Sequence, residues 1–180
     1  EVLASYGNTH TGTSITGLQT SCFRHEARQT IAESVNAHAK NDVVLFTGTG
    51  STGAINTLCH VLNLGRRDDA YFVAMRNSKQ DTDAGLVDPQ GWSGVVFVGA
   101  YEHHSNMLPW RETAAKVVTI GLTSSGELDL VALEAALLAH ALFPVKVGAF
   151  SAASNITGLL TDVNSVSAVR FVSSAAHMLL

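Results

Sequence analysis

The glycine-rich stretch GTGSTGAIN (48–56) is the first place in this sequence where the residue types could do chemistry. It follows the β-branched run DVVLFT (42–47) and opens a segment with helical apolar spacing, so it predicts a strand, a loop and a helix. Backbone N–H groups at the start of such a helix bind anions, and Ser51 and Thr52 would add hydroxyl donors, which suits a phosphate. An ordinary Gly/Ser/Thr turn is the structural alternative.

The same stretch also matches the GxGxxG pattern of dinucleotide-binding loops through Gly48, Gly50 and Gly53. No lysine follows the glycines, so it is not a Walker A loop. In a dinucleotide-binding unit an acidic residue closes the second strand, whereas Asp68 and Asp69 directly follow the predicted helix. A nucleotide-binding Rossmann-like module therefore stays as the alternative function.

Two adjacent histidines, His103 and His104, lie in the stretch EHHSNMLPWRE (102–112), which follows an apolar run (94–100). Neighbours in an extended segment point to opposite sides, and no carboxylate or cysteine spacing completes a metal site. Two interpretations stay open. Either the histidines stabilise a polar loop through hydrogen bonds, or one imidazole stacks on a planar heteroaromatic ligand while the other ring anchors the loop. The second interpretation would also explain a phosphate site nearby.

A third polar stretch, SNITG (154–158), follows the apolar run 145–152. The side-chain amide of Asn155 could donate to a phenolate-like oxygen, or it could cap the turn ahead of Gly158. Ligands of open α/β sheets bind beyond the carboxyl ends of the strands. The three polar stretches are therefore expected on one side of the sheet.

The elements that must position these residues alternate between short apolar runs and amphipathic segments. This pattern is typical of a parallel sheet covered on both faces, so the fold class is α/β, a three-layer α/β/α structure with a mostly parallel sheet. Asp129 is a candidate N-cap for the last helix. The predicted strands are 42–47, 94–100, 116–122 and 145–152, and helices are predicted at 23–39, at 54–64 and after Asp129.

The composition narrows the class of protein. Hydrophobic residues make up 46% and charged residues 14% of the 180 residues, with a formal net charge of −4 and no basic run, so no nucleic-acid or membrane partner is expected. No apolar run is long enough to cross a bilayer and no secretory signal is visible, which predicts a soluble, intracellular protein. Cys22 and Cys59 lack the spacing of a zinc site or a disulfide framework, and no metal is expected.

Together these stretches resemble the class V aminotransferases, and within them the cysteine desulfurase and selenocysteine lyase group, which have the fold of type I pyridoxal-phosphate enzymes. The resemblance runs from about Tyr6 to about Val163. It is carried by NTHTGTS with the RHEAR helix, FTGTGSTGAIN, EHHSNMLPWRE and SNITG, in the order of the family. The EHHSN stretch with its following Pro-Trp is the most specific of these motifs.

The resemblance implies pyridoxal 5′-phosphate as the cofactor. Ser51 and Thr52 would bind its phosphate, His103 would stack on the pyridine ring, and Asn155 would donate a hydrogen bond to the ring oxygen. Three further residues would be neighbours of the active site: Gly50, His10 and His104. The parent enzyme would be a homodimer and would act on an amino acid, by C–S or C–Se bond cleavage or by transamination.

The chain departs from the family pattern in two protein groups that tune this cofactor. The aspartate that pairs with the pyridine nitrogen and the Ser-x-His-Lys that carries the Schiff-base lysine are not found. The four lysines, Lys40, Lys79, Lys116 and Lys146, match no such motif. We therefore expect the N-terminal portion of an enzyme, with weak or no cofactor binding and no activity as this chain alone. A non-catalytic fragment without a ligand is the third alternative.

The expected organisation has three parts: an N-terminal irregular segment (1–22), a partial pyridoxal-phosphate transferase large domain (23–163) and a divergent C-terminal tail (164–180). Neither the amino-acid substrate nor the choice between desulfurase and aminotransferase follows from these residues.

Overall fold

The computed structural model describes residues 6–9, 11–38, 40–65, 94–143, 145–169 and 176–179. The chain forms two compact units, Glu1–Thr47 and Gly48–Leu180, and each is described by itself. Among the described helices, none combines the length and the apolar character that crossing a bilayer requires. The acidic pair at 68–69 and the predicted active-site neighbour His10 lie outside the described residues.

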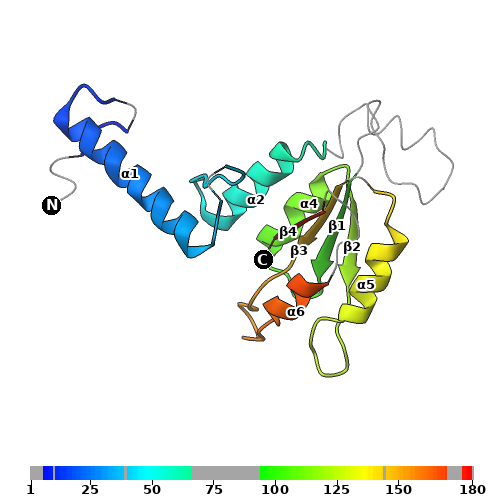
Figure 1. Cartoon of the computed structure of the whole chain (residues 1–180). Helices are drawn as coiled ribbons and strands as arrows, with labels where there is room; N and C mark the ends of the chain where they lie inside the picture. The colour runs from blue at the N-terminus through cyan, green and yellow to red at the C-terminus, as the bar shows by residue number, and fades with distance from the viewer. Residues whose placement is uncertain are drawn as a thin grey trace. The chain divides into compact units, whose positions relative to one another are not determined.

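The first unit contains one long helix, α1 (Ile15–Ser34) (Figure 1). Ser14 caps it, because its hydroxyl oxygen accepts a hydrogen bond from the backbone N–H of Gly17 at 3.1 Å. The helix therefore begins before Phe23, the start that the apolar spacing predicts, and its first turns lie in the stretch predicted to be irregular. The cap decides where the helix begins.

The strand predicted at 42–47 is wrong, because these residues contain no strand. The apolar side chains of the run stay largely in solvent: Val43 is 77% exposed, Leu45 is 59% exposed and Phe46 is 44% exposed. The guanidinium of Arg28 lies 5.7 Å from the centre of the Phe46 ring, which joins this segment to α1. A β-branched run becomes a strand only where a neighbouring strand pairs with it.

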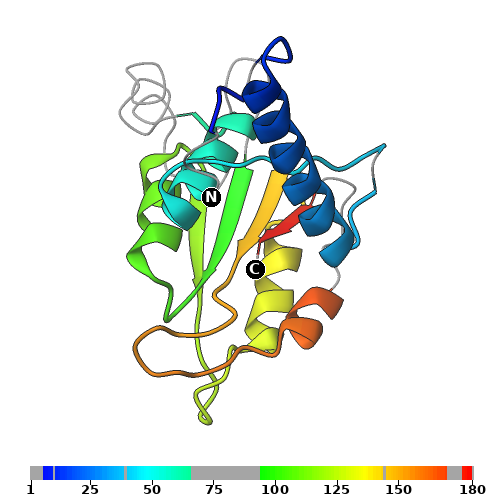
Figure 2. The ribbon, with the colours of Figure 1, turned by 90° about the vertical axis from the view of Figure 1, so that its left-hand side faces the viewer.

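The second unit is built on a four-stranded parallel sheet with the order β2-β1-β3-β4. The strands lie side by side in Figure 2. The three strands predicted after the glycine loop are confirmed, and a fourth strand lies in the segment expected to be a divergent tail. The bounds are β1 (Gly94–Gly99), β2 (Lys116–Ile120), β3 (Val145–Ala149) and β4 (Ala176–Leu179).

Helices cover both faces of the sheet, which confirms the predicted α/β class. The bounds are α2 (Gly50–Val61), the 3-10 helix η2 (His104–Asn106), α4 (Leu108–Glu112), α5 (Leu130–Ala139) and α6 (Val163–Ala168). On one face, Val96 packs with Ile55 of α2 and Trp110 of α4. On the other face, Phe97 packs with Leu133 of α5 and with α6. Every residue of β1 is consequently buried, as a central strand between two helical layers must be (Figure 1).

The two units and the three predicted domains divide the chain differently. The boundary between the compact units falls at 47–48, inside the predicted large domain 23–163. The three-part organisation stays a prediction. The segment 164–180 continues α6 and supplies β4, so its described part belongs structurally to the second unit.

Candidate functional site

A cavity of about 390 Å³ lies in the second unit, where α2 meets the carboxyl ends of β1 and β3. A pocket of this volume suits a small ligand. Three segments far apart in the sequence contribute to it, and two of them follow a strand of the sheet. The lining residues are Ser51, Ala54 and Ile55 of α2, His103, Ser105 and Asn106 after β1, and Phe150 and Ser151 after β3.

The glycine loop supplies the start of α2 to this cavity. Thr49 and Gly50 both have left-handed backbone conformations, with φ of 52° and 62°, and Thr49 makes no side-chain capping hydrogen bond. The positive φ favours glycine at position 50. Because the first-turn N–H groups of a helix have no intrahelical partner, an oxyanion bound there would satisfy them. Ser51 lines the cavity in the first turn of α2, and its role as a phosphate-binding residue stays a prediction.

Thr52 is directed to the histidine loop. Its hydroxyl donates a hydrogen bond to the Ser105 hydroxyl oxygen at 2.8 Å. Thr52 therefore ties the glycine loop to the segment after β1, and it leaves the Ser105 hydroxyl hydrogen available to the cavity. Ser105 lines the cavity but was not predicted as a site residue, although it lies within the EHHSN stretch.

His103 lies at the cavity wall, and its backbone is extended just before η2. Its Nδ1 accepts a hydrogen bond from the backbone N–H of Ser105 at 3.1 Å. An imidazole that accepts at Nδ1 is neutral and carries its hydrogen on Nε2. His104 is exposed, its ring centre lies 6.3 Å from that of His103, and it does not line the cavity.

Asn155 lies in the turn after β3, where it is exposed and does not line the cavity. The turn is stabilised by its neighbour Ser154, whose hydroxyl oxygen accepts from the backbone N–H groups of Ile156 and Thr157 at 3.3 and 3.2 Å. Capping of the turn is therefore the task of Ser154. The predicted contact of Asn155 with a ring oxygen stays a prediction.

Two further residues of the site were missed by sequence reasoning. Ser151 lines the cavity directly after β3, and Glu102 accepts hydrogen bonds from both the backbone N–H and the hydroxyl of Ser151, at 2.8 and 2.6 Å. Glu102 begins the EHHSN stretch and Ser151 follows an apolar strand, so the sequence shows where each residue lies along the chain. Local sequence patterns do not show that the two residues, 49 positions apart, form hydrogen bonds with each other.

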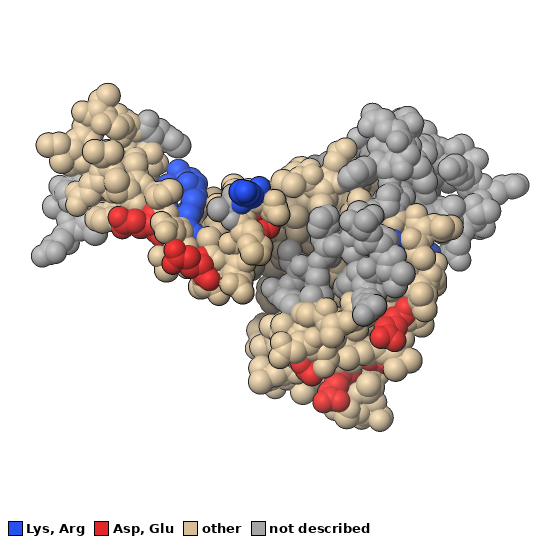
Figure 3. All heavy atoms as spheres, in the orientation of Figure 1, with Lys and Arg blue, Asp and Glu red and all other residues tan. Residues whose placement is uncertain are grey.

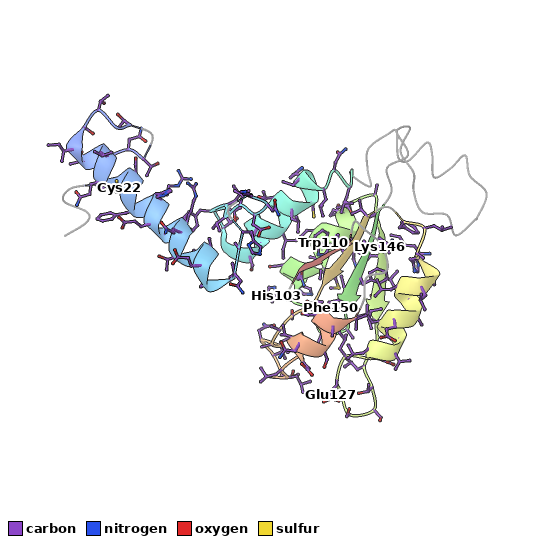
Figure 4. The ribbon with its side chains drawn as sticks, in the orientation of Figure 1. Cys22, His103, Trp110, Glu127, Lys146 and Phe150 are labelled. Carbon is purple, nitrogen blue, oxygen red and sulfur yellow. The ribbon has the colours of Figure 1, made fainter. Side chains whose placement is uncertain are left out.

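The donor set fits a small phosphorylated heteroaromatic compound. Free N–H groups and Ser51 suit a phosphate, the His103 imidazole suits a planar ring, and Phe150 provides an apolar wall. The described residues that line the cavity include no lysine or arginine, and they offer N–H and O–H donors to an anion. Figure 4 shows His103 and Phe150 near one end of the strands, whereas Lys146 lies toward the other end, at the start of β3.

The fold does not support the nucleotide-binding alternative. A dinucleotide-binding unit needs a strand directly before its glycine loop, and residues 42–47 contain none. The described part of the chain also brings together no cluster of three His, Cys, Asp or Glu side chains that could bind a metal ion.

Curated relatives match most of this chain. A probable cysteine desulfurase of Streptomyces coelicolor is 29% identical over 163 residues, which cover 88% of this chain and 33% of the relative. A probable cysteine desulfurase of Vibrio cholerae is 27% identical over 164 residues, again covering 88% of this chain and 33% of the relative. The chain thus spans about a third of the length of these relatives.

Solved structures show the same fold. The apo cysteine desulfurase of Thermococcus onnurineus matches 97% of this chain with a TM-score of 0.64 and 18% identity, and the match covers 37% of that structure. The sequence model of the family described as aminotransferase class-V matches residues 86–177, just over half of the chain. This match includes β1 to β3, the EHHSN stretch and most of the segment after Val163. The chain belongs to the class V aminotransferase family.

Proposed function

We propose that this chain provides the phosphate- and ring-binding part of a pyridoxal 5′-phosphate site in a cysteine desulfurase-like enzyme that acts on an amino acid. One observation carries the proposal: the start of α2 with Ser51, the His103 ring and the Phe150 wall line a single cavity. The names of the relatives point to the same chemistry, since they are cysteine desulfurases. Homodimer formation is part of the proposal, by resemblance to the family.

Each of these residues has a defined task in this proposal. The first-turn N–H groups of α2 and the Ser51 hydroxyl bind the phosphate, and the Ser105 hydroxyl adds a donor. The face of His103 packs against the ring, and Phe150 keeps water from the cavity wall. When bound, pyridoxal phosphate acts as an electron sink for bond cleavage in an amino acid. Asn155 is proposed to donate to the ring oxygen.

The test uses pyridoxine 5′-phosphate, because this compound lacks the aldehyde that would react with surface lysines. We expect weak but saturable binding by calorimetry, with pyridoxine that lacks the phosphate binding at least tenfold more weakly still. Ser51→Ala and His103→Ala should each weaken binding about fivefold to tenfold, the usual effect of losing one hydrogen bond or one ring contact. Ser167→Ala, an exposed position on α6, is the matched control.

One binding result would contradict this proposal. Saturable NAD binding that Gly50→Ala removes and His103→Ala leaves unchanged would replace this proposal with the nucleotide-binding alternative.

A further inference from the structure

We propose that Glu102 is a positioning residue, which holds His103 and Ser151 in place around the cavity. The inference rests on the proposed function, because it concerns the same cavity. Glu102 is half-buried and does not line the cavity itself. Its carboxylate accepts three hydrogen bonds, from the Ser151 backbone N–H at 2.8 Å, the Ser151 hydroxyl at 2.6 Å and the Asn106 side-chain amide at 2.7 Å.

The network is anchored in the core of the second unit. The side-chain oxygen of Asn106 accepts a hydrogen bond from the indole N–H of Trp110 at 3.3 Å, and Trp110 is fully buried. Gly99 leaves room for the carboxylate, because a Cβ at that position would lie 2.6 Å from Glu102 Oε1. Glu102 is therefore confined between the end of β1, η2 and the segment after β3.

The bond between Glu102 and Asn106 closes the segment that carries His103. Both ends of this five-residue segment are held, and between them the Ser105 N–H donates to His103 Nδ1 at 3.1 Å. This geometry keeps the imidazole in one orientation, with its hydrogen on Nε2. Glu102 thus acts on the ring through the backbone and Asn106, without touching the ring.

A second set of contacts fixes the opposite wall. The Thr161 hydroxyl donates to the Ser151 carbonyl oxygen at 2.5 Å and lies 2.7 Å from the Tyr101 hydroxyl. Tyr101 precedes Glu102, so two adjacent residues reach the segment after β3. The segments after β1 and β3 are consequently joined by hydrogen bonds beside the cavity.

A carboxylate suits this position better than an amide. Its two oxygens accept all three donors, whereas a glutamine offers one oxygen and would direct its own NH₂ at a donor. Asn106 cannot turn its amide around without losing the bond to Trp110. Glu102→Gln should therefore release the segment around His103 while leaving the shape of the side chain almost unchanged.

The experiment measures the tautomer of His103 in the full chain by long-range ¹H–¹⁵N correlation NMR, with the resonance assigned by its loss in His103→Asn. We expect the Nε2–H tautomer in the wild type and a mixture of tautomers in Glu102→Gln. The affinity for pyridoxine 5′-phosphate should fall about tenfold in the same variant. Glu134→Gln, an exposed position on α5, should change neither readout.

An unchanged His103 tautomer in folded Glu102→Gln would overturn the inference. If that variant does not fold, Ser151→Ala decides, because it removes one donor to Glu102 and keeps the backbone donor. A small shift of the same resonance supports the inference, and no shift overturns it. The tautomer is read without ligand, so failure of the wild type to bind pyridoxine 5′-phosphate would overturn the proposed function alone.

Discussion

At the scale of single residues, burial separates side chains that look alike in the sequence. Cys22 is exposed on α1, whereas Cys59 is partly buried on α2, where it packs against the core. Burial raises the pKa of the Cys59 thiol to about 11. Only the thiolate is nucleophilic, so Cys59 is a packing residue at neutral pH.

Alkylation tests this difference. At pH 8, iodoacetamide should modify Cys22 about 100-fold faster than Cys59, because the raised pKa leaves only about one thousandth of the Cys59 thiol ionised. Peptide mass spectrometry gives both rates in the same sample. The rate at Cys59 should increase steeply as the pH approaches 11. Equal rates at pH 8 would contradict the burial of this thiol.

Lys146 is a charged residue inside the sheet. It is 1% exposed, and its Nζ donates a hydrogen bond to the carbonyl oxygen of Phe143 at 2.6 Å. Burial disfavours the ammonium form and lowers the pKa of Lys146 below its usual 10.5. In the unfolded chain the pKa returns to the usual value.

This shift predicts a pH dependence of stability. Between the lowered pKa of the folded chain and 10.5, the unfolded chain binds more protons, so the free energy of unfolding should rise with pH across that window. Lys146→Met should remove this part of the rise, whereas Lys40→Met, at an exposed position, should keep it. Urea unfolding followed at several pH values gives the slopes. A slope that is the same in wild type and Lys146→Met would be incompatible with a lowered pKa.

At the scale of secondary structure, polar caps decide where helices begin. The Asp129 carboxylate accepts a hydrogen bond from the Ala132 N–H at 2.9 Å, as the sequence predicts for α5. Asp162 does the same for α6 through the Ser165 N–H at 3.1 Å and also accepts from the Ser165 hydroxyl. These bonds lower the pKa of Asp162, so its capping contribution is present above pH 3.8 and is lost as the pH falls through its lowered pKa.

Loss of the α5 cap should destabilise the second unit measurably. Asp129→Ala is expected to lower the free energy of unfolding by about 1 kcal/mol, because the N–H of Ala132 loses its partner. Asp129→Ser keeps a capping oxygen and should recover most of that loss. Urea denaturation followed by circular dichroism measures both variants. If Asp129→Ser were as unstable as Asp129→Ala, the hydrogen bond would not be the source of the effect.

At the scale of the whole molecule, the sheet of the second unit is buried on both faces. Val95 and Val96 are neighbours on β1 and are both fully buried, one against α5 and α6 and the other against α2 and α4. In a sheet with one face in water, one of the two would be exposed. On the face of this unit that Figure 3 shows, the acidic side chains (red) form small groups among uncharged residues (tan).

The three-layer arrangement therefore predicts that two adjacent substitutions cost the same. Val95→Ala and Val96→Ala should each lower the free energy of unfolding by about 2 kcal/mol, because each removes buried methyl groups from a different core. Val131→Ala on α5 is the control, since Val131 is 78% exposed and its loss should cost little. Chemical denaturation gives the three values. A large cost at only one of the two strand positions would mean that one helical layer is not packed.

Local patterns in the sequence were sufficient for several elements. The apolar runs at 94–100, 116–122 and 145–152 predicted β1 to β3, because a strand buried on both faces needs consecutive apolar residues. Asp129 predicted the start of α5, because a helix cap needs a polar side chain at that position. The run at 42–47 has the same composition and forms no strand. Pairing with another strand depends on distant residues, so local composition does not determine it.

The sequence by itself determined the family, the α/β class and the residue types of the candidate site, since these depend on motifs and on local periodicity. Only the tertiary structure decided which of these residues meet. Ser51 and His103 line one cavity, and Glu102 bonds to Ser151, while Asn155 lies outside the cavity wall. Such contacts arise when helices and strands from separate parts of the chain pack together, and that packing is a property of the whole core.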